Sequence, residues 1–269
     1  MKLLVVTPTL GESPWLEETI SSVAAVAGAP EHVLVAPADK VAALARRYPR
    51  VAVVAEPGGG MYAAINAGLA VGRAWDAFTY INDDDVLLPD FAAVVNAVRE
   101  GGAGGPRIAY GGVRLIDAEG RRIGAIPISP TPEINRALYA QRLEPVFQHG
   151  TVATRAVVEL MGGFNASLRF CGDSEFLARA CLRGIPFLRV TRREVAAFRL
   201  RPGQLTKNRP AMIAERAQVD SSLELERTGP AAELRMARWR FRLANAPIYA
   251  ERIVRHGFVS FDELLTRLG

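Results

Sequence analysis

Strand and helix signals alternate through the first hundred residues, and the connections between them are short. Short β-branched runs predict strands, and apolar residues that recur every three or four positions predict helices. Strands are expected at Leu3–Val6, His32–Ala36, Val51–Ala55 and Phe78–Asn82, and helices after Pro14 and at Lys40–Tyr48, Met61–Arg73 and Phe91–Arg99. This alternation predicts an α/β fold in which a parallel sheet carries helices on both faces.

The rest of the sequence predicts a change of topology and then a helical region. After a glycine-rich loop at 101–106, two extended runs flank a turn-like Asp-Ala-Glu-Gly sequence, which predicts an antiparallel hairpin. The expected elements are strands at Arg107–Ile116, Arg121–Ile128 and Phe147–Thr154, and helices at Pro132–Ala140, Ala156–Met161, Ser174–Arg183, Ala211–Arg227, Ala231–Leu243, Ile248–Arg255 and Phe261–Leu268. We expect an α/β domain over residues 1–208, with halves at 1–100 and 101–208, and a helical C-terminal region over 209–269.

Length and composition are those of a globular protein. The chain has 269 residues, and its apolar residues form short runs, far below the roughly 18 to 20 consecutive apolar residues of a membrane span. The first residues lack a secretory pattern, so a cytoplasmic protein is expected. Cys171 and Cys181 lack metal-site spacing and are expected to be reduced thiols. The net charge of +5 suits phosphates or a lipid surface, but no nucleic-acid-binding signature occurs, so no nucleic-acid partner is expected.

An apolar run at 78–82 ends in three consecutive carboxylates, Asp83, Asp84 and Asp85. Adjacent acids repel one another, and a divalent cation would relieve that repulsion. In open parallel sheets, ligands bind beyond the carboxyl ends of the strands, which is where these acids are expected. The alternative interpretation is a solvated turn that caps the helix beginning after Pro89.

Several sequence blocks occur in an order that is typical of one family. These blocks are 6–9 with 15–23, then 56–68, then 81–86, and finally 161–165 with 171–176. The ordered set resembles the family-2 glycosyltransferases, which transfer a sugar from a nucleotide-sugar donor, and it covers roughly the first two hundred residues. The resemblance implies a GT-A-like fold, in which the sheet binds the nucleotide sugar.

The resemblance assigns the acid block to the metal and the donor. Asp85 is expected to be the direct ligand of Mn²⁺ or Mg²⁺ with Asp83 beside it, and Asp84 is expected to face the ribose or the sugar. The metal would stabilise the charge that develops on the departing diphosphate. Because three acids in a row allow more than one register, the choice of the carboxylate that binds the metal stays open.

The second acidic block is expected on the acceptor side. Asp173 matches the base position of the family, and deprotonation of an acceptor hydroxyl requires such a group. Its alternative role is to cap the helix that follows it. Glu175 is the reserve base on the acceptor side, and His149, next to Gln148, is expected either to line the acceptor pocket or approach the metal, or to be a core residue.

The other expected contacts come from the glycine triplet, its helix and a late basic segment. Gly58 to Gly60 let the backbone approach a ligand ahead of a helix N-terminus, which favours anions. The basic side chains of 198–207 are expected to meet the diphosphate, unless they form a solvated loop. The expected donor-binding residues are Thr7, Pro8, Thr9, Glu12, Glu56, Gly60, Tyr62, Asn66, Asn82, Asp83, Asp84, Arg199 and Lys207, with Arg201 as a further candidate.

The nucleotide base and the acceptor are less constrained. The segment 35–39 departs from the family's base-binding pattern, which weakens the assignment of uridine. The donor nucleotide therefore stays open, with a UDP-sugar expected first and a GDP- or dTDP-sugar next. A glycan or lipid-linked acceptor in surface polysaccharide biosynthesis is expected. The basic and aromatic segment 235–243 fits either a helix packed on the domain or a helix that lies peripherally on the inner face of the membrane.

Two other functions compete with a metal-dependent, inverting glycosyltransferase. A sugar-phosphate nucleotidyltransferase should carry a loop rich in glycine and arginine after the first strand, and the sequence 9–13 does not supply one. A non-catalytic scaffold that binds nucleotide sugars is opposed by the presence of Asp85 and Asp173. The glycosyltransferase is therefore the preferred interpretation.

Overall fold

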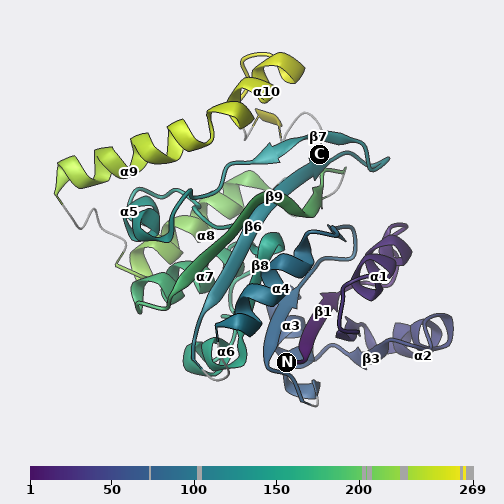
Figure 1. Cartoon of the computed structure of the whole chain (residues 1–269). Coiled ribbons are helices and arrows are strands. Elements are labelled where there is room, and N and C mark those ends of the chain that lie inside the picture. The colour runs from purple at the N-terminus through teal and green to yellow at the C-terminus, as the bar shows by residue number, and fades with distance from the viewer. Residues whose placement is uncertain are drawn as a thin grey trace.

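The computed structural model describes residues 1–72, 74–101, 105–201, 204, 208–224, 230–260 and 263–264. Within these residues, nine strands form one mixed sheet (Figure 1). The strands are β1 (Leu3–Pro8), β2 (Glu31–Ala36), β3 (Ala52–Ala55), β4 (Ala77–Tyr80), β5 (Val86–Leu87), β6 (Ile108–Ile116), β7 (Arg122–Ile126), β8 (Thr151–Thr154) and β9 (Phe187–Arg199). Their order is β3-β2-β1-β4-β8-β6-β9-β5, and β7 pairs with β6.

Helices cover both faces of this sheet. They are α1 (Leu16–Ala24), α2 (Ala38–Arg47), α3 (Met61–Val71), α4 (Phe91–Glu100), α5 (Asn135–Tyr139), α6 (Arg155–Met161), α7 (Gly172–Leu182), α8 (Arg209–Ser222), α9 (Ala231–Ala244) and α10 (Ala246–His256), with 3₁₀ turns η1 (Pro132–Ile134) and η2 (Gln148–Gly150). α3, α6 and α7 pack on one face, and α1 and α4 pack on the other. The predicted α/β fold is confirmed.

The first four strands run parallel, as the alternating sequence predicted. β1 lies between β2 and β4, and Val5 is in register with His32 on one side and with Thr79 on the other. Because all three strands point the same way, the residues that follow β1 and β4 meet at one edge of the sheet. This edge receives Thr9 and the three acids.

The second half of the sheet contains antiparallel pairs. The predicted hairpin is present, with Val113 of β6 in register with Ile126 of β7. β8 joins the two halves, since it runs antiparallel to β4 and to β6. β8 is shorter than the extended run predicted at 147–154, because residues 148–150 form the turn η2.

The sequence did not predict β9, which has 13 residues and runs parallel to β6. The polar residues Thr191 to Glu194 interrupt the apolar alternation that marks a strand, so the local pattern does not predict a strand across them. The structure supports this polar stretch from neighbouring strands, because Glu194 accepts hydrogen bonds from Arg114 and Arg122 at 2.7 Å each. Arg199 is consequently the last residue of a strand.

The C-terminal helices pack against the sheet domain. α9 buries Leu234, Ala237 and Phe241 against α5, and Val219 of α8 joins the main core. α8 ends at residue 222, short of the predicted end at 227, and most of the helix predicted at 261–268 lies outside the described residues. The domain boundary after residue 208 stays a prediction. No helix in the described ranges is long and apolar enough to cross a membrane.

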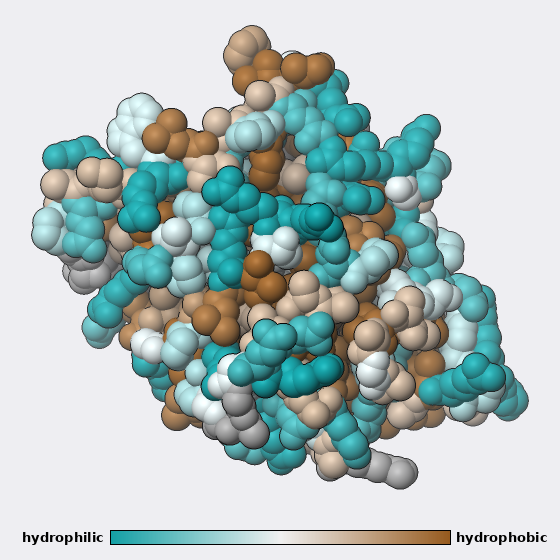
Figure 2. Space-filling view, in the orientation of Figure 1, coloured by the Kyte–Doolittle hydropathy of each residue, from teal (hydrophilic) through white to brown (hydrophobic). Residues whose placement is uncertain are grey.

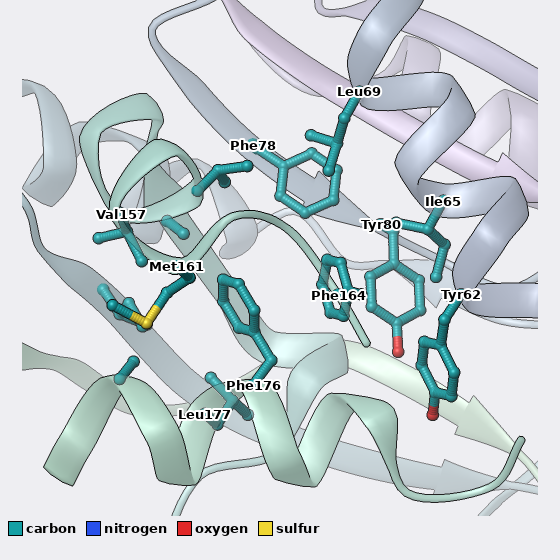
Figure 3. Packing of buried hydrophobic residues seen from close by; sticks show 14 of the residues in the cluster. Tyr62, Ile65, Leu69, Phe78, Tyr80, Val157, Met161, Phe164, Phe176 and Leu177 are labelled. Carbon is teal, nitrogen blue, oxygen red and sulfur yellow. The ribbon is translucent and has the colours of Figure 1, made fainter. Parts of the chain in front are cut away.

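The largest core cluster lies between α3, α6, α7 and the sheet. Phe164 is at its centre, stacked on Phe176 with ring centroids 4.5 Å apart and edge-on to Tyr80 at 5.6 Å. Figure 3 shows Tyr62 and Tyr80 next to each other at one end of this cluster, with both hydroxyl oxygens directed away from the apolar centre. The aromatic cluster therefore presents two phenols toward the edge of the sheet that carries the acids.

Candidate active site

The acid block begins beyond the carboxyl end of β4. Thr9, just after β1, donates a hydrogen bond from Oγ1 to Asp83 Oδ2 at 2.6 Å, and Ser13 Oγ donates to the backbone carbonyl of Asp83 at 2.7 Å. Burial raises the pKa of Asp83, although the Thr9 hydroxyl acts in the opposite direction. The segment after β1 thus holds the first acid in place at the sheet edge.

Asp85 is fully buried, and both of its carboxylate oxygens are hydrogen-bonded. The backbone N–H of Arg199 donates to Oδ1 at 2.8 Å. Asn82 donates its Nδ2 to Oδ2 at 3.0 Å, and His149 Nε2 is 2.9 Å from the same oxygen. Asp85 therefore ties β4, β9 and η2 together, and a metal bound by Asp85, as predicted, would share the carboxylate with these bonds.

Asp84 is buried and forms an ion pair with a side chain that partly faces solvent. Its Oδ2 accepts a hydrogen bond from Arg201 Nε at 2.5 Å. Burial raises the pKa of Asp84 to about 6, the neighbouring Asp85 adds to the rise, and Arg201 opposes it. A carboxylate with a raised proton affinity among other acids would be stabilised as the anion by a cation.

Arg199 links the acid block to two other segments. Its guanidinium donates from Nε to the carbonyl of Asp84 at 2.7 Å, from Nη1 to the carbonyls of Asp117 and Ala118, and from Nη2 to Glu18 at 2.5 Å. The side chain is only 1% exposed. The predicted contact between Arg199 and a diphosphate is not favoured, because the guanidinium is buried and each of its three nitrogens is hydrogen-bonded within the protein.

Asp173 lies in the first turn of α7 and receives a hydrogen bond from α3. Tyr62 OH is 3.0 Å from Asp173 Oδ1. The close approach requires Gly172, since a Cβ there would lie 2.6 Å from the Tyr62 ring. Burial raises the pKa of Asp173, Glu144 adds to the rise, and the Tyr62 hydrogen bond opposes it. A carboxylate with a raised pKa can accept a proton from a hydroxyl more readily than an ordinary one.

The loop that precedes Asp173 is held from α8. The Glu215 carboxylate accepts hydrogen bonds from three successive backbone N–H groups, those of residues 169–171, each at 2.7 Å. On the other side, Ser174 Oγ donates to Glu144 at 2.6 Å. The position of Asp173 therefore depends on an acid of the C-terminal region as well as on its own helix.

His149 and Gln148 connect the two acidic regions. Burial alone would lower the pKa of His149, but the hydrogen-bonded Asp85 outweighs it and raises that pKa. Gln148 donates its Nε2 to the carbonyl of Tyr80. The remaining polar atoms, His149 Nδ1, Gln148 Oε1 and Asn82 Oδ1, are buried and have no hydrogen-bond partner in the described structure. This concentration of unused polar atoms is typical of a site that binds a ligand or water.

A small cavity of about 20 Å³ lies beneath this region. Tyr80, Gln148 and Asp173 contribute to its wall, together with Phe164 and Phe176. A space of this size accommodates about one water molecule. Gln148 and Asp173 both line this space, and the neighbouring His149, which is bonded to Asp85, is close enough to Asp173 for the charge of that carboxylate to raise the pKa of His149.

The glycine triplet forms an open turn between β3 and α3. Gly58, Gly59 and Gly60 all have left-handed φ angles, +81°, +93° and +92°. Residues other than glycine rarely adopt this backbone conformation, so the shape of the turn favours glycine at these three positions. Glu56 is half-buried, and its N–H donates to the carbonyl of Ala36 at 2.8 Å. The turn leaves its backbone exposed ahead of α3, which is compatible with the predicted donor contact at Gly60.

Two predicted donor residues near β1 have other partners. Thr7 is fully buried, and its Oγ1 lies 3.0 Å from His32 Nε2, whose pKa burial lowers to about 4. Glu12 is exposed and pairs with Lys40 at 3.1 Å. Pro8 is half-buried at the end of β1. Direct donor contacts of the Thr7 and Glu12 side chains are not favoured by these pairings and stay predictions.

Two further predicted residues serve the packing of α7. Asn66 donates to the carbonyl of Phe164 at 2.8 Å and accepts from its N–H at 2.9 Å, so the side chain clamps a loop. Glu175 is buried and bonded to Arg179 at 2.6 Å. These contacts leave neither side chain directed to a substrate, and they favour Asp173 over Glu175 as the base. Lys207 lies outside the described residues.

The sequence did not reveal the residues that support the site. Trp15 lies beneath both guanidinium groups, 5.3 Å from Arg199 and 5.5 Å from Arg201. Glu18 pairs with Arg199 across 181 positions of the chain, and Glu215 caps the loop before α7. Nothing in the local sequence marks these residues, since their partners are distant along the chain. Of these residues, Glu18 could be explained locally as an acid that favours the N-terminus of its helix, but its pairing with Arg199 could not be predicted.

The acid block can be tested for its fit to the divalent cation that the family resemblance implies. In the described ranges, no group of three or more His, Cys, Asp or Glu side chains is placed to hold a metal ion. Cations that bind substrate phosphates commonly use only one or two protein carboxylates. Among the described contacts, hydrogen bonds reach only Oδ2 of Asp83 and of Asp84, whereas Asp85 uses both oxygens. On these contacts Asp83 and Asp84 keep more acceptor capacity for a cation than Asp85 does.

Comparisons with known proteins agree with the fold. The family model described as glycosyl transferase family 2 matches residues 4–158. None of the curated proteins matches the chain. The solved structure of S. aureus TarS 1–349 in complex with UDP-GlcNAc is 15% identical with a TM-score of 0.63, covering 98% of this chain and 78% of that one. The mannosyltransferase PcManGT from Pyrobaculum calidifontis, in complex with GDP-Man and Mn²⁺, is 18% identical with a TM-score of 0.57, covering 98% and 78%.

The structural likenesses, at these low identities, establish the fold. The family match covers more than half of the chain, and it includes β1, the glycine triplet, the acid block and His149. This match supports the glycosyltransferase over the two competing interpretations, a nucleotidyltransferase and a non-catalytic scaffold. The chain belongs to glycosyl transferase family 2 and is a glycosyltransferase with the GT-A fold.

Proposed function

We propose that the protein transfers a sugar from a nucleoside diphosphate sugar to an acceptor hydroxyl, with a divalent cation and with inversion at the anomeric carbon. One observation carries this proposal: an acid block beside Arg201 and a carboxylate with a raised pKa, Asp173, lie at the same edge of the sheet. Transfer from a diphosphate needs charge stabilisation at the leaving group and a base at the attacking hydroxyl. The two regions match these two requirements.

The donor half of the proposal concerns Asp83 and Asp84. They would hold Mn²⁺ or Mg²⁺, which would supply positive charge to the departing diphosphate. Arg201 is 27% exposed and is bonded to Asp84, so it can contribute a second positive charge at the same place. The PcManGT neighbour was solved with Mn²⁺, which supports this cation. Asp85 and Arg199, both buried, would keep the block rigid behind the ligands.

The acceptor half concerns Asp173. Its carboxylate would take the proton of the acceptor hydroxyl, while the hydrogen bond from Tyr62 to Oδ1 orients the carboxylate. A hydroxyl activated on the side opposite to the departing diphosphate would displace it in one step, and a single displacement inverts the anomeric centre. His149, whose pKa the buried Asp85 raises, lies between the two halves and would line the acceptor pocket.

The proposal also covers the class of the donor nucleotide and of the acceptor. A UDP-sugar is favoured because the TarS neighbour binds UDP-GlcNAc, and a GDP-sugar comes next because PcManGT binds GDP-Man. A dTDP-sugar stands behind them. A glycan or lipid-linked acceptor in surface polysaccharide biosynthesis, and action in the cytoplasm, are proposed from the family resemblance.

Calorimetric titration with UDP, GDP and dTDP, with and without Mn²⁺, tests the donor site. We expect one nucleotide to bind in a Mn²⁺-dependent manner, and Asp84→Asn to abolish that dependence. The matched control is Asp90→Asn, because Asp90 lies six residues further along, is half exposed and contacts Arg193 only at 3.7 Å. Asp85→Asn separates the two possible ligands, since a folded Asp85→Asn protein without Mn²⁺-dependent binding would make Asp85 the ligand. Absence of Mn²⁺-dependent binding in the wild type would contradict the donor half.

A further inference from the structure

α9 carries apolar side chains on two opposite faces. Leu234, Ala237 and Phe241 form one stripe, which is buried against α5. Met236, Trp239 and Leu243 form a second stripe, and these side chains are 61%, 62% and 66% exposed. Since each residue turns an α-helix by about 100°, the second stripe points about 160° away from the first. An ordinary surface helix has polar residues on that face.

Arginines flank the exposed stripe on both sides. By the same helical geometry, Arg235 and Arg242 lie along one side of it and Arg240 along the other, and all three are exposed. Glu233 is the only acid on this helix. The exposed face of α9 is therefore apolar along its middle and positively charged along the margin of Arg235 and Arg242, whereas Arg240 on the other margin lies near Glu233 and Glu133.

Large apolar side chains are also exposed beyond α9. Val254 of α10 is 85% exposed, and Phe258, two residues after α10, is 93% exposed. Both helices lie along the upper margin of the molecule in Figure 1, and Figure 2 shows brown atoms on that margin over α9 and α10, separated by teal ones. We define the apolar ridge as Met236, Trp239, Leu243, Val254 and Phe258.

We propose that the apolar ridge and its flanking arginines bind to an anionic lipid bilayer. A helix with an apolar face and a basic margin lies in the bilayer interface, and tryptophan is favoured at that depth. Each arginine near an anionic surface adds to the attraction. A second copy of the chain is a poorer occupant of the ridge, because a two-fold contact would bring the arginines of both copies together.

This inference deepens the proposed function by naming the surface at which the enzyme would meet a lipid-linked acceptor. Only that consequence rests on the proposed function. Binding to vesicles is measured without any sugar transfer, so a failure of one proposal can be told apart from a failure of the other.

Flotation of the full chain with vesicles provides the test. We expect the protein to float with vesicles of phosphatidylcholine and phosphatidylglycerol at low salt, and to stay behind with phosphatidylcholine alone. High salt should release it, since the screening of exposed charges strengthens with ionic strength. The double variant Arg235→Glu/Arg242→Glu should lose flotation on the anionic vesicles.

A matched pair of leucine variants identifies the surface. Leu243→Gln removes an apolar residue of the ridge, and Leu160→Gln removes a leucine of α6 that is 53% exposed and outside the ridge. Loss of one large apolar contact should weaken partitioning about tenfold for Leu243→Gln and leave it unchanged for Leu160→Gln. Circular dichroism checks that both variants fold.

Three outcomes would overturn the proposal. The wild type could fail to float with anionic vesicles at low salt, or the two leucine variants could lose flotation equally. Sedimentation velocity provides the third outcome: a dimer that Leu243→Gln dissociates, in a protein that does not float, would show that the ridge binds a second copy.

Discussion

The acid block and Asp173 are two carboxylate regions at one edge of the sheet, and the protein surrounds them differently. The block contacts two guanidinium groups and a histidine, through Arg199, Arg201 and His149. Asp173 instead receives a hydrogen bond from a phenol, and its pKa is raised by burial and by the nearby Glu144. The first region is built to compensate charge, while the second keeps a carboxylate without a cationic hydrogen-bond partner among the described contacts.

This difference separates two chemical tasks. A group that neutralises a leaving diphosphate must keep positive charge close to it, whereas a base must be able to take up a proton. An arginine bonded to Asp173 would hold its pKa down and weaken it as a base. The two regions therefore should respond differently to substitution, and the following predictions test that.

The largest effect is expected from Asp173→Asn. We expect turnover to fall by roughly 10² to 10⁴, because general-base catalysis contributes about that factor, while Mn²⁺-dependent nucleotide binding stays near wild type. Turnover assays and calorimetry on the same preparation measure both. Glu175→Gln, on the same helix but paired with Arg179, is the control and should reduce turnover far less. A larger loss in Glu175→Gln would make Glu175 the base, and parallel loss of turnover and binding in Asp173→Asn would make Asp173 a helix cap.

Substitution of the two arginines that contact the acid block should affect different properties, stability for Arg199 and nucleotide binding for Arg201. Arg199→Met leaves the buried carbonyl of Asp84 without a donor and removes one of the two donors to the carbonyls of Asp117 and Ala118, and we expect the free energy of unfolding to fall by about 1 to 3 kcal/mol. Arg201→Met should cost much less stability, because Arg201 is partly exposed, but should weaken nucleotide binding. Urea denaturation and calorimetry compare the variants. Equal losses of stability would contradict the assignment of a structural role to Arg199 alone.

The fold could be predicted where local pattern and tertiary role coincide. The parallel strands and the hairpin could be predicted from β-branched runs and turn residues, because the local sequence of these strands is itself apolar. β9 could not be predicted, since its residues 191–194 are polar and are stabilised by Arg114 and Arg122 of other strands. The position of Arg199 at a strand end, instead of in a loop, depends on that missed strand.

The site could be predicted as a set of blocks but not as a set of contacts. The order of the motifs predicted that Asp83, Asp84 and Asp173 would share a site with the glycine triplet. It could not predict that Asp85 would face inward, because Asp83, Asp84 and Asp85 are equivalent in sequence and only the turn between β4 and β5 distinguishes them. The support from Glu215 was also hidden, since a glutamate in the middle of a helix usually faces water.

A smaller effect is expected from Glu215, which supports the Asp173 region alone. Glu215→Gln removes the charge that accepts three backbone N–H groups, so the loop 169–171 should loosen. We expect turnover to fall about tenfold with unchanged nucleotide affinity, and the amides of this loop to exchange hydrogen faster. Glu159→Gln is the control, because Glu159 is exposed and pairs with Arg155 on the surface. Unchanged amide exchange in Glu215→Gln would contradict a positioning role.

The smallest effect is a shift in the pH profile. Asp173 acts as a base only when it is ionised, so kcat/KM should fall as the pH drops through its pKa, which burial raises above the ordinary carboxyl value. Tyr62 donates a hydrogen bond to the anion and lowers that pKa, so Tyr62→Phe should raise the pKa and move the acid limb of the profile upward by roughly one pH unit. Tyr80→Phe is the matched control, because Tyr80 lies beside Tyr62 and has no hydrogen bond to Asp173 among the described contacts (Figure 3). An acid limb that moves equally in both variants, or that moves downward in Tyr62→Phe, would mean that a group other than Asp173 controls it.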